Sequence, residues 1–162
     1  NKRVDVVLPP PIPVRERPPR DTFSRTETTL GLFLLYPRLR PLMGELIAPE
    51  GGMAKALYDA LKQAPAEERL TPDMLDLSSE HRERVAILQL FAEVHNFGDW
   101  SETHATREIR RNCMIANREV LRSKQQEISR ELQEARVAGR RAEEERLSTQ
   151  YQQILKLAKM AG

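Results

Sequence analysis

The sequence has a single cysteine, Cys113, few aromatic residues and almost no excess of one charge. One cysteine excludes an internal disulfide and a zinc site built from cysteine ligands. A net charge of +2 over 162 residues does not fit a strongly basic nucleic-acid binder. No stretch approaches the ~20 apolar residues of a membrane-spanning helix, and no secretory signal segment is present. We therefore expect a fragment of a longer cytoplasmic protein that does not act at a membrane.

Glycine is scarce, with 7 residues against 11 prolines, and the prolines cluster. Six of them lie between residues 9 and 19. Proline lacks a backbone N–H and favours extended neighbours, so neither a helix nor an inner strand is expected there. We predict a semi-rigid linker over residues 1–21.

From residue 22 onward, apolar residues recur at helical spacing, and no segment shows the period-two alternation of a strand. The fold class that we predict is therefore all-α, with an N-terminal helical bundle over residues 22–100. Thr71 is a candidate hydroxyl N-cap with proline following it, and Gly98 suits a left-handed helix end. The helices expected in the bundle cover residues 22–36, 38–47 (started by Pro41), 53–63, 72–77 and 79–95.

Beyond Trp100 the chain contains no proline and a single aromatic residue. One long connecting helix is predicted over residues 101–138, about 50 Å long at ~1.5 Å per residue, with Ser101 or Asp99 as its cap. A turn ending at Gly139 then leads into a last helix within residues 139–162. Together the two helices form a C-terminal helical hairpin.

Few residues have the pattern of a chemical site. His104 and Glu108 lie one helical turn apart, but two ligands do not close a zinc site. Cys113 has apolar spacing and is interpreted as a buried small hydrophobe. The acidic run 143–145 offsets the positive end of a helix dipole. No nucleophile, base and orienting group come together, so we expect no catalytic residue, no metal and no cofactor.

Six basic residues are spaced along the predicted long helix. Glutamates interleave with them and stacking aromatics are missing, which favours a solvated face over single-strand binding. Residues 23–100 carry about −4 charges and residues 101–162 about +4. Direct nucleic-acid contact is therefore expected to be weak or absent. The six are Arg107, Arg110, Arg111, Arg118, Arg122 and Lys124.

The last helix carries more apolar surface than a two-helix hairpin can hide. Its main stripe repeats at helical spacing, and Leu157 lies off that stripe. Such a surplus on a terminal element indicates partner binding, although self-association or packing back onto the bundle is also compatible with it. The stripe consists of Leu147, Tyr151, Ile154, Leu155 and Ala158.

Two segments resemble the C-terminal domain of bacterial DNA primases of the DnaG type. Residues 26–39 (Thr-Glu-Thr-Thr-Leu-Gly-Leu-Phe-Leu-Leu-Tyr-Pro-Arg-Leu) resemble the apolar helix and proline-containing motif that open it. The sequences Glu-Glu-Arg-Leu at 144–147 and Ile-Leu-Lys-Leu-Ala-Lys at 154–159 resemble its extreme C-terminus. The resemblance spans about residues 22–162.

The resemblance implies a non-catalytic, bacterial and cytoplasmic helicase-binding domain, with the primase's catalytic and zinc-binding parts upstream. Its implied partner is the replicative hexameric DNA helicase of the DnaB type, and docking of single-strand-binding protein stays open. Two alternatives remain: an architectural coiled-coil dimerisation module and an accessory nucleic-acid-binding domain. The partner-binding residues that we expect are Leu147, Gln150, Tyr151, Ile154, Leu155, Leu157, Ala158 and Lys159.

The proline content of residues 1–21 predicts that this segment is dispensable for folding. Limited proteolysis is expected to cut there first and to leave a stable product beginning near Thr22, identified by mass spectrometry. Protection of the segment from protease would contradict this.

Overall fold

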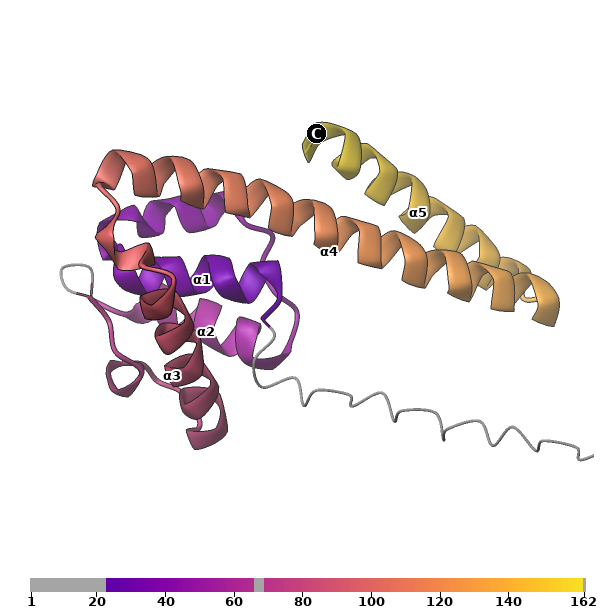
Figure 1. The fold of residues 1–162 in the computed structure, drawn as a ribbon. Helices are drawn as coiled ribbons and strands as arrows, with labels where there is room; N and C mark the ends of the chain where they lie inside the picture. The colour runs from indigo at the N-terminus through magenta and orange to yellow at the C-terminus, as the bar shows by residue number, and fades with distance from the viewer. Residues whose placement is uncertain (1–22, 66–68, 162) are drawn as a thin grey trace, which may run out of the picture.

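The computed structural model describes residues 23–65 and 69–161, in which it has five α-helices and three 3-10 helices (Figure 1). No strand occurs in these two ranges, so the all-α prediction is confirmed. The linker expected over residues 1–21 lies outside them. Across the same ranges, no helix has both the length and the apolar composition needed to cross a bilayer.

Helix α1 (Arg25–Leu35) forms the centre of the bundle. Its residues 29–35 are all buried, as in a helix that neighbours enclose on every side. A capping box fixes its start: the Ser24 hydroxyl accepts from the Glu27 N–H, and the Glu27 carboxylate accepts from the Ser24 N–H. The buried Thr29 hydroxyl is satisfied because it donates to the Arg25 carbonyl at 2.7 Å.

Helices α2 (Gly52–Gln63), α3 (Ser79–Val94) and α4 (Glu102–Ala138) all pack against α1. At Gly31 the approach of α3 is close, since a Cβ there would lie 3.1 Å from the Cγ of Leu88. The core therefore draws on all four helices. Its fully buried members include Leu30, Phe33, Leu57, Leu61, Val85, Leu88 and Ile109.

The segment after α1 differs from the prediction. Instead of an α-helix started by Pro41, the structure has a 3-10 helix, η2 (Pro37–Glu45), with Pro41 inside it. A proline ring clashes with the carbonyl four residues earlier and offers no N–H, so an α-helical ladder cannot continue through it. The Arg40 guanidinium donates to the carbonyls of Leu61 and Ala64 at 2.6 and 2.5 Å. These bonds satisfy carbonyl groups at the end of α2.

The helix predicted after Thr71 begins where expected, with Thr71 as its N-cap residue and Pro72 at its first position. The Thr71 side chain makes no capping bond, however, and the helix, η3 (Pro72–Met74), ends after 3 residues instead of near Leu77. The left-handed position predicted at Gly98 is also wrong. The residue with left-handed backbone before η4 (Phe97–Asp99) is Asn96, with φ 58°, rather than Gly98. Asparagine tolerates this conformation because its short amide can bond locally. Ser78 caps α3 by accepting from the His81 N–H at 3.3 Å.

A tyrosine fixes the junction between the bundle and the long helix. The Tyr36 hydroxyl donates to the Phe97 carbonyl and accepts from the Trp100 N–H at 3.1 Å. The Tyr36 and Trp100 rings stack with centroids 6.4 Å apart. Burial raises the pKa of Tyr36, so its hydroxyl stays protonated at neutral pH. Ser101, one of the two predicted caps, then caps α4 by accepting from the His104 N–H.

The first half of α4 belongs to the bundle. Ala105, Ile109, Cys113 and Ala116 are at most 1% exposed and lie in the core cluster. The bundle core therefore extends past the boundary expected at residue 100. The far half of α4 forms the predicted hairpin with α5 (Arg141–Ala161), and Gly139, with φ 70°, makes the turn.

Replacing Gly31 by Val is expected to destabilise the bundle, because the added side chain overlaps Leu88 on α3. Overpacking of this kind costs about 1–3 kcal/mol. Urea unfolding followed by circular dichroism measures the change. Gly44→Val is the matched control, since nothing lies within 4 Å of a Cβ at that position. An equal loss in both variants would contradict the close approach of α1 and α3.

Candidate functional site

An apolar seam holds α5 against α4. Leu147 and Ile154 of α5 are 1% and 8% exposed. Leu121 and Ala135 are the buried residues in the far half of α4. Two of the eight residues expected to bind a partner, Leu147 and Ile154, therefore mainly hold the hairpin together.

The other six expected residues lie at the edges of the seam or outside it. Gln150, Tyr151, Leu155 and Ala158 are half-buried, and Lys159 is exposed. Leu157 is 52% exposed, as its position off the stripe predicts. The fold thus divides one sequence motif between internal packing and free surface.

Sequence reasoning missed Met160. It is 84% exposed and lies three residues after Leu157, so the two side chains lie on neighbouring parts of one helical face. That spacing is the signal that could have found it. Leu157 and Met160 make up the exposed apolar end of α5.

The two hairpin helices are close at the turn and diverge toward the C-terminus of α5 (Figure 1). Ion pairs fasten the closed end: Arg136 bonds Glu144 at 3.0 Å, and Arg140 bonds Glu143 at 3.5 Å. Glu143 and Glu144 also lie in the first turn of α5, where acidic residues offset the helix dipole. At the open end, a groove of about 400 Å³ runs between the helices, with Leu121, Ile128, Ile154 and Leu157 in its wall.

A second groove lies on the other side of the seam. It is larger, about 710 Å³, and is polar apart from the ring of Tyr151. Arg122 and Arg130 contribute its positive charge and Glu134 its negative charge. The two sides of the hairpin therefore differ in chemistry. The remaining lining residues are Gln125, Gln126, Ser129 and Gln133.

The basic residues of α4 are partly neutralised by the bundle. Arg110 pairs with Glu45 at 3.5 Å, and Lys124 pairs with Glu50 at 2.6 Å. The hydrogen bond from Lys124, together with its charge, lowers the pKa of Glu50. Arg111 and Arg118 are exposed. The face is therefore a mixed, solvated surface rather than a continuous positive track.

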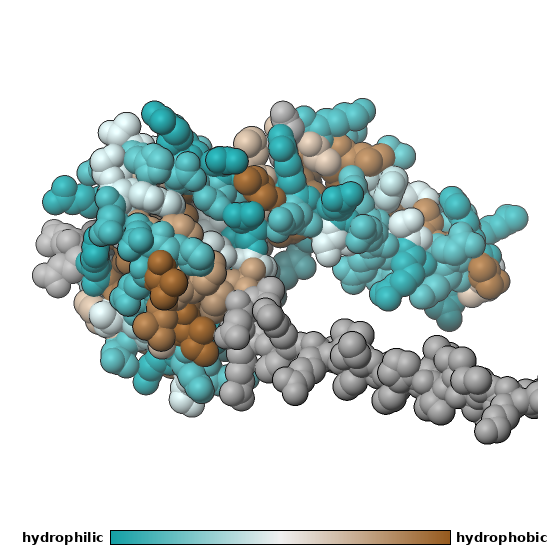
Figure 2. All heavy atoms as spheres, in the orientation of Figure 1, coloured by the Kyte–Doolittle hydropathy of each residue, from teal (hydrophilic) through white to brown (hydrophobic). Residues whose placement is uncertain are grey.

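Apolar surface is also exposed over the α3 region of the bundle (Figure 2). On α3, Leu90 is 59% and Val94 75% exposed. These two residues lie one helical turn apart on the outer side of the helix.

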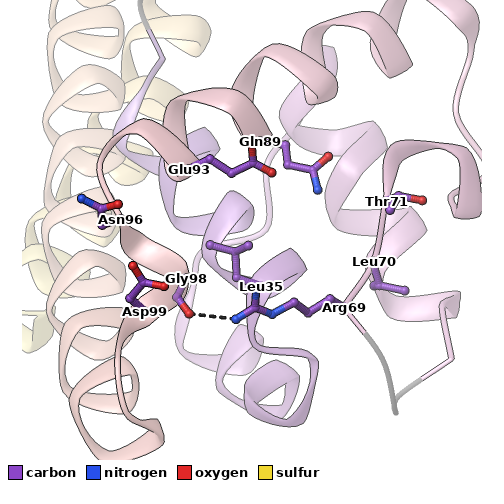
Figure 3. A pocket seen from close by; sticks show the side chains of 9 residues that line it. All are labelled: Leu35, Arg69, Leu70, Thr71, Gln89, Glu93, Asn96, Gly98 and Asp99. Atoms are coloured by element: carbon purple, nitrogen blue, oxygen red, sulfur yellow. Dashed lines mark hydrogen bonds between the residues drawn. The ribbon is translucent and has the colours of Figure 1, made fainter.

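A polar pocket of about 390 Å³ lies where α3 and η4 meet (Figure 3). The Arg69 guanidinium donates to the Gly98 carbonyl at 2.8 Å, and Glu93 and Asp99 supply carboxylates. Neither a histidine nor Cys113 lines it. Within the described ranges, no three His, Cys, Asp or Glu side chains gather as a metal site.

Cys113 is 1% exposed in the bundle core. Burial, and to a smaller extent the charge of Glu45, raise the pKa of its thiol to about 11. The thiolate is the nucleophilic form, and at neutral pH the thiol is protonated. The position and protonation of Cys113 fit a packing role.

Comparison with protein-family models, with curated proteins and with solved structures finds no match for this chain.

Iodoacetamide is expected to leave Cys113 unmodified in the folded chain at pH 7.5 and to alkylate it fully in urea. The raised pKa and the burial both suppress the thiolate in the native state. Mass spectrometry gives the modified fraction after matched incubations. Rapid native alkylation would contradict the packing role.

Proposed function

We propose that this chain is a non-catalytic helicase-binding domain. Its C-terminal hairpin binds the replicative hexameric DNA helicase and thereby couples primer synthesis to unwinding. The observation that carries the proposal is the exposed apolar end of α5, where Leu157 is 52% and Met160 84% exposed. Leu157 also lines a groove with an apolar wall. Both residues lie on α5, the helix farthest from the bundle core.

Physical chemistry favours docking at this end of α5. Removing apolar surface from water stabilises a complex by about 25 cal/mol for each Å² that becomes buried. Interfaces depend on a few such anchors, which sit in desolvated pockets. Because α5 packs chiefly on α4, a partner can reach its outer side without displacing the bundle.

The primase resemblance supplies the partner's identity, and its two segments contribute differently. Leu30 and Leu34 of the first segment are buried, so that segment builds the core and bears on the fold. The second segment forms α5 and contains Leu157, so it bears on docking.

The two alternatives have weaker physical support. A dimerisation coil needs a free apolar stripe, yet Ala105 and Ile109 are covered by the bundle and Leu121 lies along the seam with α5. A nucleic-acid face needs uncompensated positive charge, and Arg110 and Lys124 pair with bundle glutamates.

Leu157→Asp is expected to weaken binding to the hexameric replicative helicase by more than about 2 kcal/mol, the loss typical of a central anchor. Co-elution on size exclusion and titration calorimetry with the purified helicase measure it. Helical content and melting of the bundle should stay unchanged, because Leu157 lies outside the core cluster.

Leu90→Asp is the matched control, since Leu90 has a similar exposure of 59% but lies on α3. It should bind the helicase as the wild type does, and so should Arg111→Glu combined with Arg118→Glu. Loss of binding in the arginine pair but not in Leu157→Asp would move the site to α4. Loss in Leu90→Asp alone would move it to α3.

A further inference from the structure

The open-end groove combines an apolar wall with unpaired negative charge. Among the described residues, three glutamates line it, Glu50, Glu127 and Glu131, together with one cation, Lys124. Lys124 is already bound to Glu50 at 2.6 Å. In the described part of the chain, Glu127 and Glu131 form no ion pair.

Glu127 and Glu131 lie one turn apart on α4, so their like charges repel each other. A cation bound between them relieves this repulsion. Within residues 23–65 and 69–161 no ion pair supplies this cation, and Lys156 and Lys159 of α5 do not line the groove. The two carboxylates are therefore free to pair with an incoming group.

The apolar part of the groove is suited to a helix. Ile128 of α4 and Leu157 of α5 lie on opposite walls, with Ile154 in the seam between them. The volume of about 400 Å³ fits a few apolar side chains rather than a folded loop. Amphipathic helices bind by placing anchors at i, i+3 or i+4 into such grooves.

We propose that this groove binds an amphipathic helix of the partner, whose apolar side chains enter between Ile128 and Leu157 and whose flanking lysines or arginines pair with Glu127 and Glu131. This rests on the proposed function, which names the helicase as the partner, and adds the chemistry of the helicase segment that docks. The polar groove on the Tyr151 side has neither the apolar wall nor the net negative charge for this role. Charge complementarity thus selects which side of the hairpin the partner covers.

The first test compares two charge reversals in the full chain. Glu127→Lys with Glu131→Lys should weaken binding to the hexameric helicase by about tenfold at low salt, and less at high salt, where charges are screened. Glu119→Lys with Glu145→Lys makes the same change in net charge at two exposed positions outside the groove. This control should bind within about twofold of the wild type.

The outcomes distinguish a failure of the groove proposal from a failure of the proposed function. If Leu157→Asp loses binding but the Glu127/Glu131 reversal does not, the groove proposal fails while the helicase-binding function stands. If both charge reversals weaken binding equally, the effect is general electrostatics and the groove proposal fails. If the wild-type chain does not bind the helicase, the proposed function fails, and the second test decides about the groove.

The second test needs no helicase. A synthetic amphipathic helix of leucine and lysine is titrated into the isotope-labelled chain, with a leucine and glutamate peptide as its counterpart. The lysine peptide should shift the methyl signals of Leu121, Ile128, Ile154 and Leu157, and the glutamate peptide should not. Equal shifts from both peptides, shifts confined to other surfaces, or formation of a chain dimer that displaces the lysine peptide would overturn the proposal.

Discussion

Helix α1 is stable in water only when other helices cover it, because residues 29–35 leave no polar side for solvent. Each large apolar side chain that is fully buried contributes roughly 1.5–3 kcal/mol, and α1 supplies Leu30, Leu32, Phe33 and Leu34. Three helices are recruited to this one surface. The absence of a side chain at Gly31 allows α3 its close approach.

Covering α1 also determines where the hairpin lies. Ala105 and Ala116 are small, so α4 can pack closely on the bundle along its first half. The bonds of Tyr36 to Phe97 and Trp100 fix the point at which α4 begins. Because α4 is one continuous helix, this anchoring holds its far half, and with it α5, beyond the core (Figure 1). The bundle thereby presents the hairpin while leaving its sides open.

The apolar residues of α5 divide between those that pack on α4 and those that stay exposed. Leu147 and Ile154 are used in the seam, and Leu157 and Met160 remain outside. The divergence of the helices toward the C-terminus of α5 opens a groove lined by Leu121 and Ile128. The two sides of the hairpin also differ in charge. One side carries the unpaired Glu127 and Glu131, and the other has a mixed polar surface.

The sequence by itself determined the features that depend on neighbours along the chain. The helical period gave α2, α3, α4 and α5 nearly their observed bounds, and Ser101 and Gly139 marked the ends of the long helix. Local steric effects and capping bonds act within one helical turn. Helix ends can therefore be predicted from neighbouring residues, without knowledge of the tertiary structure. The local reading failed at η2, where Pro41 lies inside a 3-10 helix instead of starting an α-helix, and at Asn96, which takes the left-handed backbone expected of Gly98.

Only the tertiary structure decided which side of each helix is covered and by what. The stripe of α5 was visible, yet the burial of Leu147 and the exposure of Leu157 follow from how α5 lies on α4. Likewise Glu50 and Lys124 meet across 74 residues of chain, beside Glu127 and Leu157. A helical period gives the angle of a side chain about its own axis, but the neighbour at that angle is set by the packing of the whole chain.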